Sequence, residues 1–349
     1  MTPIRTFASD NWSGAHPEVL EAVAAANDGH APAYGDDRWT AAAERRFREH
    51  FGEGAETVLV FNGSGANLVA MRVLSRGYDA VICTDTAHLH VDECGAPERI
   101  AGVKLIAVPT PDGKLTPELA SPHIARFGDD HAAQPRGISI SESTELGTVF
   151  SPDEVTALAE LAHESGMYLH VDGARLANAA VSLDLPLRAL TTDCGVDVLS
   201  FGGTKNGLLL GEAVVVLNPE LHRGLEFLRK QTGQLASKGR YLGAQFEALL
   251  GGDLWRRSAA HANAMAARLG DAADATDGAE LAHPVEANGA FVRLPAEAIE
   301  RLRSKLPGDP PFHVWDEAEG VIRLMCSWDT TEEDVERFRA ALTEALAAT

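Results

Sequence analysis

Short runs of apolar, strand-forming residues alternate with longer segments of helical periodicity from residue 57 to about residue 217. Such short runs are typical of buried strands, and the periodic segments between them are typical of amphipathic helices. The predicted strands of this region are Thr57–Phe61, Ala80–Cys83, Val103–Val108, Gly137–Glu142, Met167–Val171 and Val196–Phe201. Because strands that alternate with helices form parallel sheets covered on both faces, the pattern predicts an α/β fold with a mostly parallel sheet.

The pattern changes after about residue 250, where helical segments become rich in alanine and arginine. Two further strands follow, Phe291–Leu294 and Val321–Met325, and a last helix begins near Thr331. We therefore expect a large domain over residues 1–250, which includes an N-terminal arm, and a smaller α/β C-terminal domain over residues 251–349.

Two predicted strands end in residues that carry chemistry. Asp172 directly follows Met167–Val171, and a glycine-rich turn that contains Lys205 follows Val196–Phe201. Ligands of open α/β sheets bind at the carboxyl ends of the strands. A partly desolvated lysine can bond an aldehyde, and an acid near it can pair with a protonated ring nitrogen, which are the two protein contacts that pyridoxal phosphate requires. Taken alone, a helix-capping Asp172 and a solvated Lys205 explain these residues equally well.

A third feature is the turn after Thr57–Phe61, where Gly63, Ser64 and Gly65 open a helix. Small residues at this point let backbone N–H groups and the Ser64 hydroxyl face an anion, and the helix dipole also favours negative charge there. The segment is neither a Walker loop nor a GxGxxG motif. It predicts a phosphate cradle, although such turns are also glycine-rich for steric reasons alone.

Arg323 lies in the middle of the predicted strand Val321–Met325. A guanidinium in so apolar a strand costs free energy unless it has a partner, and a carboxylate held by two hydrogen bonds is the natural one. The sequence therefore predicts that Arg323 binds the carboxylate of a substrate. The alternative is a structural salt bridge.

Composition narrows the class of protein. The chain has 349 residues, 45% of them hydrophobic, and a formal net charge of −21, which argues against binding to nucleic acid or to an anionic membrane surface. The four cysteines are scattered and His88 and His90 lack the helical spacing of metal ligands, so we expect neither a disulfide framework nor a metal. No apolar run suits a membrane span or a leader, which predicts a cytoplasmic protein.

Several short motifs, in order along the chain, resemble those of the L-threonine aldolase family. That family consists of fold-type-I pyridoxal phosphate enzymes in the aromatic amino acid β-eliminating lyase group. The motifs are Phe7–Asp10, Gly63–Asn67, Thr86–His88, Asp172–Arg175 and the turn around Lys205. The likeness runs from near residue 7 to Arg323 and covers nearly the whole chain. It implies a fold-type-I, transferase-like large domain.

The resemblance also implies roles for single residues. His88 matches the histidine that stacks on the cofactor ring and reaches the substrate β-hydroxyl, and Ser9 would touch the substrate carboxylate. Arg175 would support the cofactor or that carboxylate, and Tyr34 belongs to a segment near the site. Arg240 would reach the phosphate bound by a neighbouring subunit, so we expect a homodimer or homotetramer with shared active sites.

One position departs from the family pattern. Threonine aldolases usually have Glu-Asn-Thr-His-Asn-Gly at the end of the strand Gly137–Glu142, whereas this chain has Ser143 for the asparagine and Glu145 for the histidine. The family's histidine helps to recognise or deprotonate the substrate hydroxyl. Either Glu145 takes over part of that task or His88 performs it alone.

The function that the resemblance implies is cleavage of L-threonine or L-allo-threonine to glycine and an aldehyde. Two other functions stay open from the sequence. One keeps the cofactor but acts on a phenylserine-type substrate or catalyses β-elimination, and the other is a catalytically silent α/β scaffold. A silent scaffold has no need of a costly arginine in a strand centre, so Arg323, together with Lys205 and Asp172, favours an enzyme.

Overall fold

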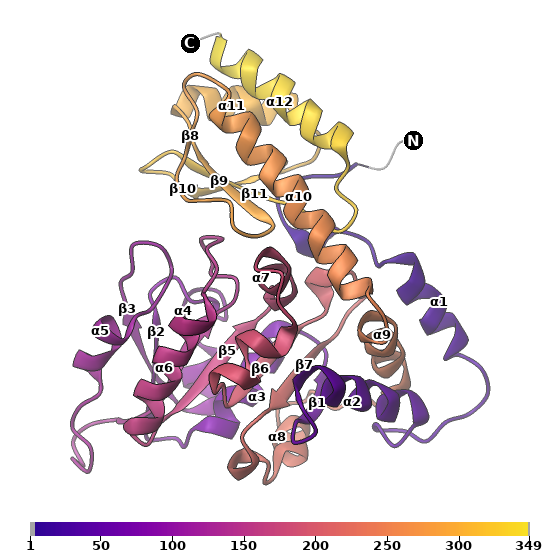
Figure 1. Ribbon diagram of the computed structural model, residues 1–349, viewed down its shortest axis with the longest axis vertical. Helices are drawn as coiled ribbons and strands as arrows, with labels where there is room; N and C mark the ends of the chain where they lie inside the picture. Colours follow the sequence, from indigo (N-terminus) through magenta and orange to yellow (C-terminus); the bar gives the residue numbers. More distant parts are fainter. Residues whose placement is uncertain (1–3, 348–349) are drawn as a thin grey trace.

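The computed structural model describes residues 4–347, which form two units stacked along the long axis of the molecule (Figure 1). The helix α10 (Leu254–Asp274) runs from the larger unit into the smaller one, and the N-terminal segment lies beside the smaller unit. Among the described residues, no helix has both the length and the hydropathy that crossing a membrane requires.

Within residues 4–347, seven strands form one sheet in the order β1-β7-β6-β5-β4-β2-β3. The strands from β6 to β3 are parallel, and β7 is antiparallel to both of its neighbours. They are β1 (Glu56–Val60), β2 (Asp79–Thr84), β3 (Lys104–Val108), β4 (Gln134–Ser141), β5 (Tyr168–Gly173), β6 (Val198–Gly202) and β7 (Glu212–Val216). The predicted mostly parallel sheet is confirmed.

Helices cover both faces of this sheet. On one face α3 (Gly63–Leu74) packs against β6 and β7, and on the other α6 (Pro152–Glu164) and α7 (Leu176–Ser182) pack against β4, β5 and β6. The other helices of the larger unit are α1 (Pro17–Ala25), α2 (Arg38–Phe51), α4 (His88–Val91), α5 (Pro117–Ala120), α8 (Leu225–Gln231) and α9 (Arg240–Leu250). Because both faces of the sheet are covered, side chains on both sides of each strand are buried. This explains why the strands are continuous apolar runs and do not alternate apolar with polar residues.

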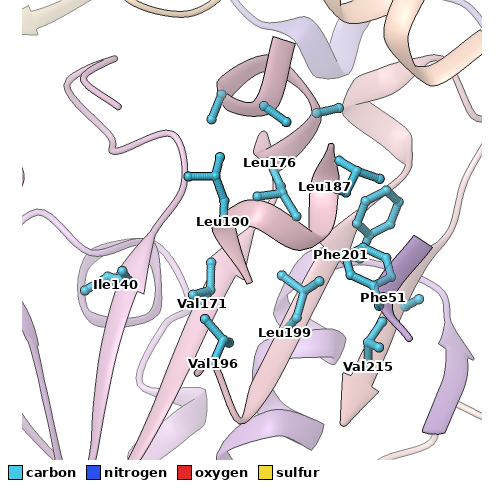
Figure 2. Close-up of a cluster of buried hydrophobic side chains, with 14 of the residues drawn as sticks. Phe51, Ile140, Val171, Leu176, Leu187, Leu190, Val196, Leu199, Phe201 and Val215 are labelled. Atoms are coloured by element: carbon cyan, nitrogen blue, oxygen red, sulfur yellow. The ribbon is translucent and has the colours of Figure 1, made fainter. Parts of the chain in front are cut away.

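The central strands place apolar side chains on both sides. Leu199 and Phe201 of β6 point into the core shared with α7, where they meet Leu176 and Leu187, whereas Val198 joins the core beneath α3 (Figure 2). Successive side chains of a strand point to opposite faces, so a single strand supplies both cores. This packing fixes the carboxyl ends of β5 and β6, where Asp172 and the Lys205 turn lie.

The smaller unit is built on a second, antiparallel sheet in the order β10-β11-β9-β8, and α10, α11 and α12 share one apolar core with it. Phe7 of the N-terminal arm belongs to its apolar core, and the Phe7 carbonyl accepts from Met325 N at 2.8 Å. The elements are β8 (Glu280–Leu281), β9 (Gly289–Arg293), β10 (His313–Asp316), β11 (Val321–Met325), α11 (Ala296–Lys305) and α12 (Glu332–Ala347). A smaller α/β C-terminal unit is therefore present.

The two units share α10. Leu254 at the start of this helix packs in the core of the larger unit, and Leu269 packs in the core of the smaller one. A division of the chain at residue 250 stays a prediction, because α10 passes from one core to the other without a break.

The closest approach between helices α2 and α9 generates a stability prediction. A Cβ on Gly243 of α9 would lie 2.5 Å from Thr40 N and 2.6 Å from Trp39 C, at the start of α2. Alanine is favoured over glycine by about 1 kcal/mol inside a helix, so an uncrowded Gly243→Ala exchange would stabilise the protein. We instead expect Gly243→Ala to lower the free energy of unfolding by about 1–3 kcal/mol, because these backbone atoms have to move.

Urea unfolding of the two proteins measures this difference, with Gly54→Ala as the control. Gly54 is exposed, and a Cβ there meets nothing within 4 Å. An increase in stability on Gly243→Ala would contradict the close packing of α2 on α9.

Candidate active site

A cavity of about 530 Å³ lies between the carboxyl edge of the large sheet and the smaller unit. It is lined by the ends of β4, β5 and β6, the first turn of α3, the N-terminal arm, and residues of β9, β10 and β11. The structure brings together at this cavity Ser9, Gly63, Ser64, His88, Glu145, Asp172, Arg175, Lys205 and Arg323. Gly65, Tyr34 and Arg240, which were also predicted for the site, do not line it.

Lys205 lies in a short 3₁₀ turn directly after β6. The turn packs so closely that a Cβ on Gly203 would come within 2.5 Å of the Gly211 carbonyl oxygen, which explains a glycine there. Glu212 at the start of β7 accepts from Gly203 N at 2.6 Å and holds the turn in place. Burial lowers the pKa of Lys205, with Arg175 acting in the same direction, so the amine loses its proton more readily than an exposed lysine.

Asp172 lies at the carboxyl end of β5 with its carboxylate held on both oxygens. Oδ2 accepts from Asn67 Nδ2 at 2.7 Å and Oδ1 accepts from Ala174 N at 3.1 Å. Burial acts to raise the pKa of Asp172, but the hydrogen bond from Asn67 and the nearby Lys205 lower it overall. The buried carboxylate is therefore kept ionised, as a partner of a protonated ring nitrogen has to be.

Two arginines at the cavity differ in whether they have a carboxylate partner. Arg175 donates to Asp10 from Nε at 2.7 Å and from Nη2 at 2.9 Å. Arg323 donates from Nη2 to the Ala8 carbonyl oxygen at 3.3 Å, and its buried Nε has no hydrogen-bond partner among residues 4–347. Burial lowers the pKa of Arg323, and Arg175 adds to this effect. The site therefore has an incompletely paired guanidinium that an anionic ligand can satisfy.

The start of α3 fits the predicted cradle only in part. Asn62 caps the helix by accepting from Gly65 N at 2.8 Å, which leaves the N–H groups of Gly63 and Ser64 without a partner among the described residues. A Cβ on Gly65 would collide with the side chain of Gln234. Gly63 and Ser64 are thus available to an anion, whereas Gly65 is small because Gln234 packs on it.

His88 and Glu145 meet at the cavity. Glu145 Oε1 accepts from His88 N at 2.9 Å and from Ser141 Oγ at 2.6 Å, and its buried Oε2 has no partner among residues 4–347. Burial raises the pKa of Glu145. The ring of His88 lies with Nδ1 2.9 Å from Glu93 Oε1, whereas His90, two residues on, is exposed. His88 and Glu145 are therefore candidates for proton exchange with a ligand in the cavity.

Tyr34 and Arg240 lie on the surface beside the cavity rather than in it. Arg240 Nη1 donates to the Gly29 carbonyl oxygen at 3.0 Å, and Nη2 donates to the Tyr241 hydroxyl at 3.2 Å. Tyr34 is 52% exposed, with Lys230 Nζ 5.3 Å from its ring centroid. Within one chain, neither residue completes the site.

Several residues that support the site were not predicted from the sequence. They are Asp10, Asn67, Glu93, Glu212 and Asn288. Asp10 and Asn67 fall inside motifs that the sequence singled out, but their partners are 165 and 105 residues away and only the fold pairs them. Glu212 directly follows Gly211, and burial raises its pKa to about 7.

Known proteins resemble this chain over most of its length. A family model described as Beta-eliminating lyase matches residues 6–297. The chain is 45% identical to a low specificity L-threonine aldolase of Pseudomonas aeruginosa, over 95% of this chain and 94% of the relative. It is 43% identical to a low specificity L-threonine aldolase of a Pseudomonas species, over 98% of each chain.

Solved structures give the same picture of the fold. The threonine aldolase of Leishmania major superposes with a TM-score of 0.91 at 33% identity, over 98% of this chain and 99% of that one. An aspartate aminotransferase of Thermus thermophilus, with a TM-score of 0.69 at 18% identity over 98% and 92% of the two chains, shares the fold alone. The predicted fold-type-I architecture is confirmed, and the chain belongs to the L-threonine aldolase family of β-eliminating lyases.

Proposed function

We propose that this chain cleaves L-threonine and L-allo-threonine between Cα and Cβ, giving glycine and acetaldehyde, with pyridoxal phosphate as its cofactor. The observation that carries the proposal is that Lys205, Asp172 and Arg323 line one cavity. These residues supply an amine, an ionised acid and an incompletely paired guanidinium. The names of the Pseudomonas relatives support the same reaction.

The residues of the cavity fit each part of pyridoxal phosphate. Lys205 has a lowered pKa and can bond the aldehyde, and the ionised Asp172 can hold the ring nitrogen in its protonated form. The N–H groups of Gly63 and Ser64 at the start of α3, which have no partner among residues 4–347, suit the phosphate. When bound, the cofactor supplies an electron sink for the charge that develops at Cα.

The two arginines have different tasks in this proposal. Arg323 binds the substrate carboxylate, with Ser9 beside it at the cavity wall. Arg175 is paired with Asp10 through Nε and Nη2, so it contributes positive charge and its remaining N–H donors to the cofactor and substrate region. A fixed carboxylate restricts the orientation of the scissile bond.

Proton transfer from the substrate β-hydroxyl falls to His88 and Glu145. Both line the cavity, and Glu145 Oε2 has no partner among residues 4–347. Glu145 Oε1 already accepts from His88 N and Ser141 Oγ. We therefore assign the larger share of the proton transfer to His88 and a supporting share to Glu145.

We also propose a homodimer or homotetramer that shares its active sites, with the cytoplasm as its location. An apolar groove of about 810 Å³ includes Leu20, Leu209 and Tyr241 and shares Phe61 and Leu210 with the cavity. Leu20 and Leu209 are half exposed, which suits coverage by a second copy of the chain. Arg240, next to Tyr241, would then lie at the edge of the neighbouring site.

The reaction itself is tested by its products. The purified chain should release glycine and acetaldehyde from L-threonine, with no ammonia, and Lys205→Ala should abolish the release. Borohydride reduction followed by peptide mapping should place the cofactor on Lys205. Ammonia in place of aldehyde would instead indicate β-elimination, and a preference for benzaldehyde release would indicate a phenylserine-type substrate.

The roles of His88 and Glu145 are separated by two variants. His88→Phe keeps an aromatic ring but removes the proton acceptor, so kcat should fall by about 10²- to 10⁴-fold while cofactor affinity changes little. Glu145→Gln should lower kcat/KM about tenfold, the equivalent of one hydrogen bond of roughly 1.4 kcal/mol. Both are measured on L-threonine and on phenylserine. If Glu145→Gln leaves both rates unchanged, Glu145 only anchors the backbone of His88.

The shared-site proposal predicts complementation between two weak variants. Lys205→Ala and Arg240→Ala, unfolded and refolded together, should recover about a quarter of wild-type activity, because half of the dimers are mixed and each mixed dimer has one intact site. Lys205→Ala mixed with Asp172→Asn is the control, since both residues belong to the same cavity and no intact site can form. Equal behaviour of the two mixtures would place Arg240 outside a shared site.

A further inference from the structure

A buried carboxylate lies directly behind the His88 ring. The Glu93 side chain is 0% exposed and does not line the cavity. Its Oε1 lies 2.9 Å from His88 Nδ1 and 2.8 Å from Asn67 Nδ2. The same Asn67 nitrogen lies 2.7 Å from Asp172 Oδ2. One amide group therefore joins two carboxylates, and one of these also contacts the histidine.

This cluster has the residue types of a metal site, but its hydrogen bonds indicate a different task. Ligand atoms of His88, Glu93 and Asp172 lie within 4.8 Å of one another. Ionised carboxylates only accept hydrogen bonds, so Asn67 has to turn its NH₂ group toward both of them. These two N–H bonds engage Glu93 Oε1 and Asp172 Oδ2, so the amide holds the two acids close together through its donors.

The same hydrogen bonds determine which nitrogen of His88 carries the proton. Glu93 Oε1 accepts from Asn67, and as a carboxylate oxygen it accepts from His88 as well, so Nδ1 is the donor. In the neutral ring Nε2 then carries a lone pair. Nε2 has no hydrogen-bond partner among residues 4–347, and His88 lines the cavity.

We propose that Glu93 is a positioning residue that holds His88 with its proton on Nδ1, so that Nε2 accepts the β-hydroxyl proton of the substrate. The identity of that proton rests on the proposed aldolase function, whereas the tautomer does not. Glu93 acts through His88 and has no contact with the cavity of its own. A carboxylate that fixes the orientation and tautomer of a catalytic imidazole is a general device for making it a base.

The charges around His88 favour this role. The hydrogen bond that His88 donates to Glu93 raises the pKa of His88 against the effect of burial, and Asp172 raises it further while Lys205 lowers it. Burial raises the pKa of Glu93, whereas the hydrogen bonds from His88 and Asn67 lower it. Glu145 contacts His88 from the other side, at the backbone N–H. A higher pKa makes Nε2 a stronger proton acceptor but also keeps it protonated to a higher pH.

The tautomer is measured directly on the holoenzyme with ¹⁵N-labelled histidine. The two nitrogen chemical shifts of a neutral imidazole distinguish the Nδ1–H from the Nε2–H form, and His88→Phe identifies the His88 signals. We expect the Nδ1–H form in the wild-type protein. An Nε2–H ring overturns the proposal even if threonine is cleaved. An Nδ1–H ring in a chain that releases no acetaldehyde contradicts the proposed function and leaves the tautomer assignment intact.

Variants then connect the tautomer to Glu93. Glu93→Gln should give a mixture of tautomers, lower the pKa of His88, and lower kcat/KM for L-threonine about 100-fold. The acid limb of the pH profile should move to lower pH, because a less basic His88 loses its proton earlier. Glu93→Asp, which keeps the charge, should restore part of the rate.

Glu98→Gln is the matched control, because it removes one charge from an exposed position in the same segment. It should change neither the ¹⁵N shifts nor the pH profile. An unchanged tautomer and acid limb in Glu93→Gln overturns the proposal, and so does an equal effect of Glu98→Gln. The wild-type tautomer decides the question even if Glu93→Gln fails to fold.

Discussion

The buried ion pair between Asp10 and Arg175 is the interaction on which the geometry of the site depends. Asp10 comes from the N-terminal arm and Arg175 from the turn after β5, and Asn288, just before β9, donates to Asp10 Oδ2 at 3.0 Å. One carboxylate thus joins the arm, the larger unit and the smaller unit. Burial acts to raise the pKa of Asp10, but Arg175 and Lys205 lower it to about 2, so the pair stays charged. Removing either partner would leave a buried charge uncompensated, at a cost of about 3–5 kcal/mol.

This pairing decides how charge is distributed around the cavity. Asp10 holds Arg175 in place through two hydrogen bonds, whereas Arg323 has no carboxylate partner and its buried Nε is unpaired among residues 4–347. Burial lowers the pKa of Lys205 and raises the pKa of Glu145, which favours the neutral form of both groups. The hydrogen bond from Asn67 instead helps to keep Asp172 ionised. A chain with a formal net charge of −21 can in this way accept an anionic cofactor and an anionic substrate, since local donors rather than the overall field hold them.

The sequence predicts those parts of this arrangement that depend on local patterns of neighbouring residues. The apolar runs mark β5 and β6, and the polar residues that end them, Asp172 and Lys205, are brought together because parallel strands end at one edge of a sheet. The roles of Asn67 and Glu93 could not be predicted, because they depend on contacts that form only in the folded chain. Asn67, for example, contacts Asp172, which is 105 positions away. For Gly65 the local motif predicts phosphate binding, and a distant residue, Gln234, gives a second reason for the missing side chain, because a Cβ would collide with it.

The replacement of the family's usual histidine by Glu145 changes what the rest of the site has to do. One oxygen of Glu145 accepts from His88 N and from Ser141 Oγ, so Glu145 contacts the backbone of His88. Glu93 instead contacts the His88 ring. His88 is therefore held at two points by two acids from different parts of the chain. Among the described residues no second histidine lines the cavity, so no other imidazole can replace His88 if its ring turns or its proton moves to the other nitrogen. Both acids that hold His88 are buried, and burial raises the pKa of each of them.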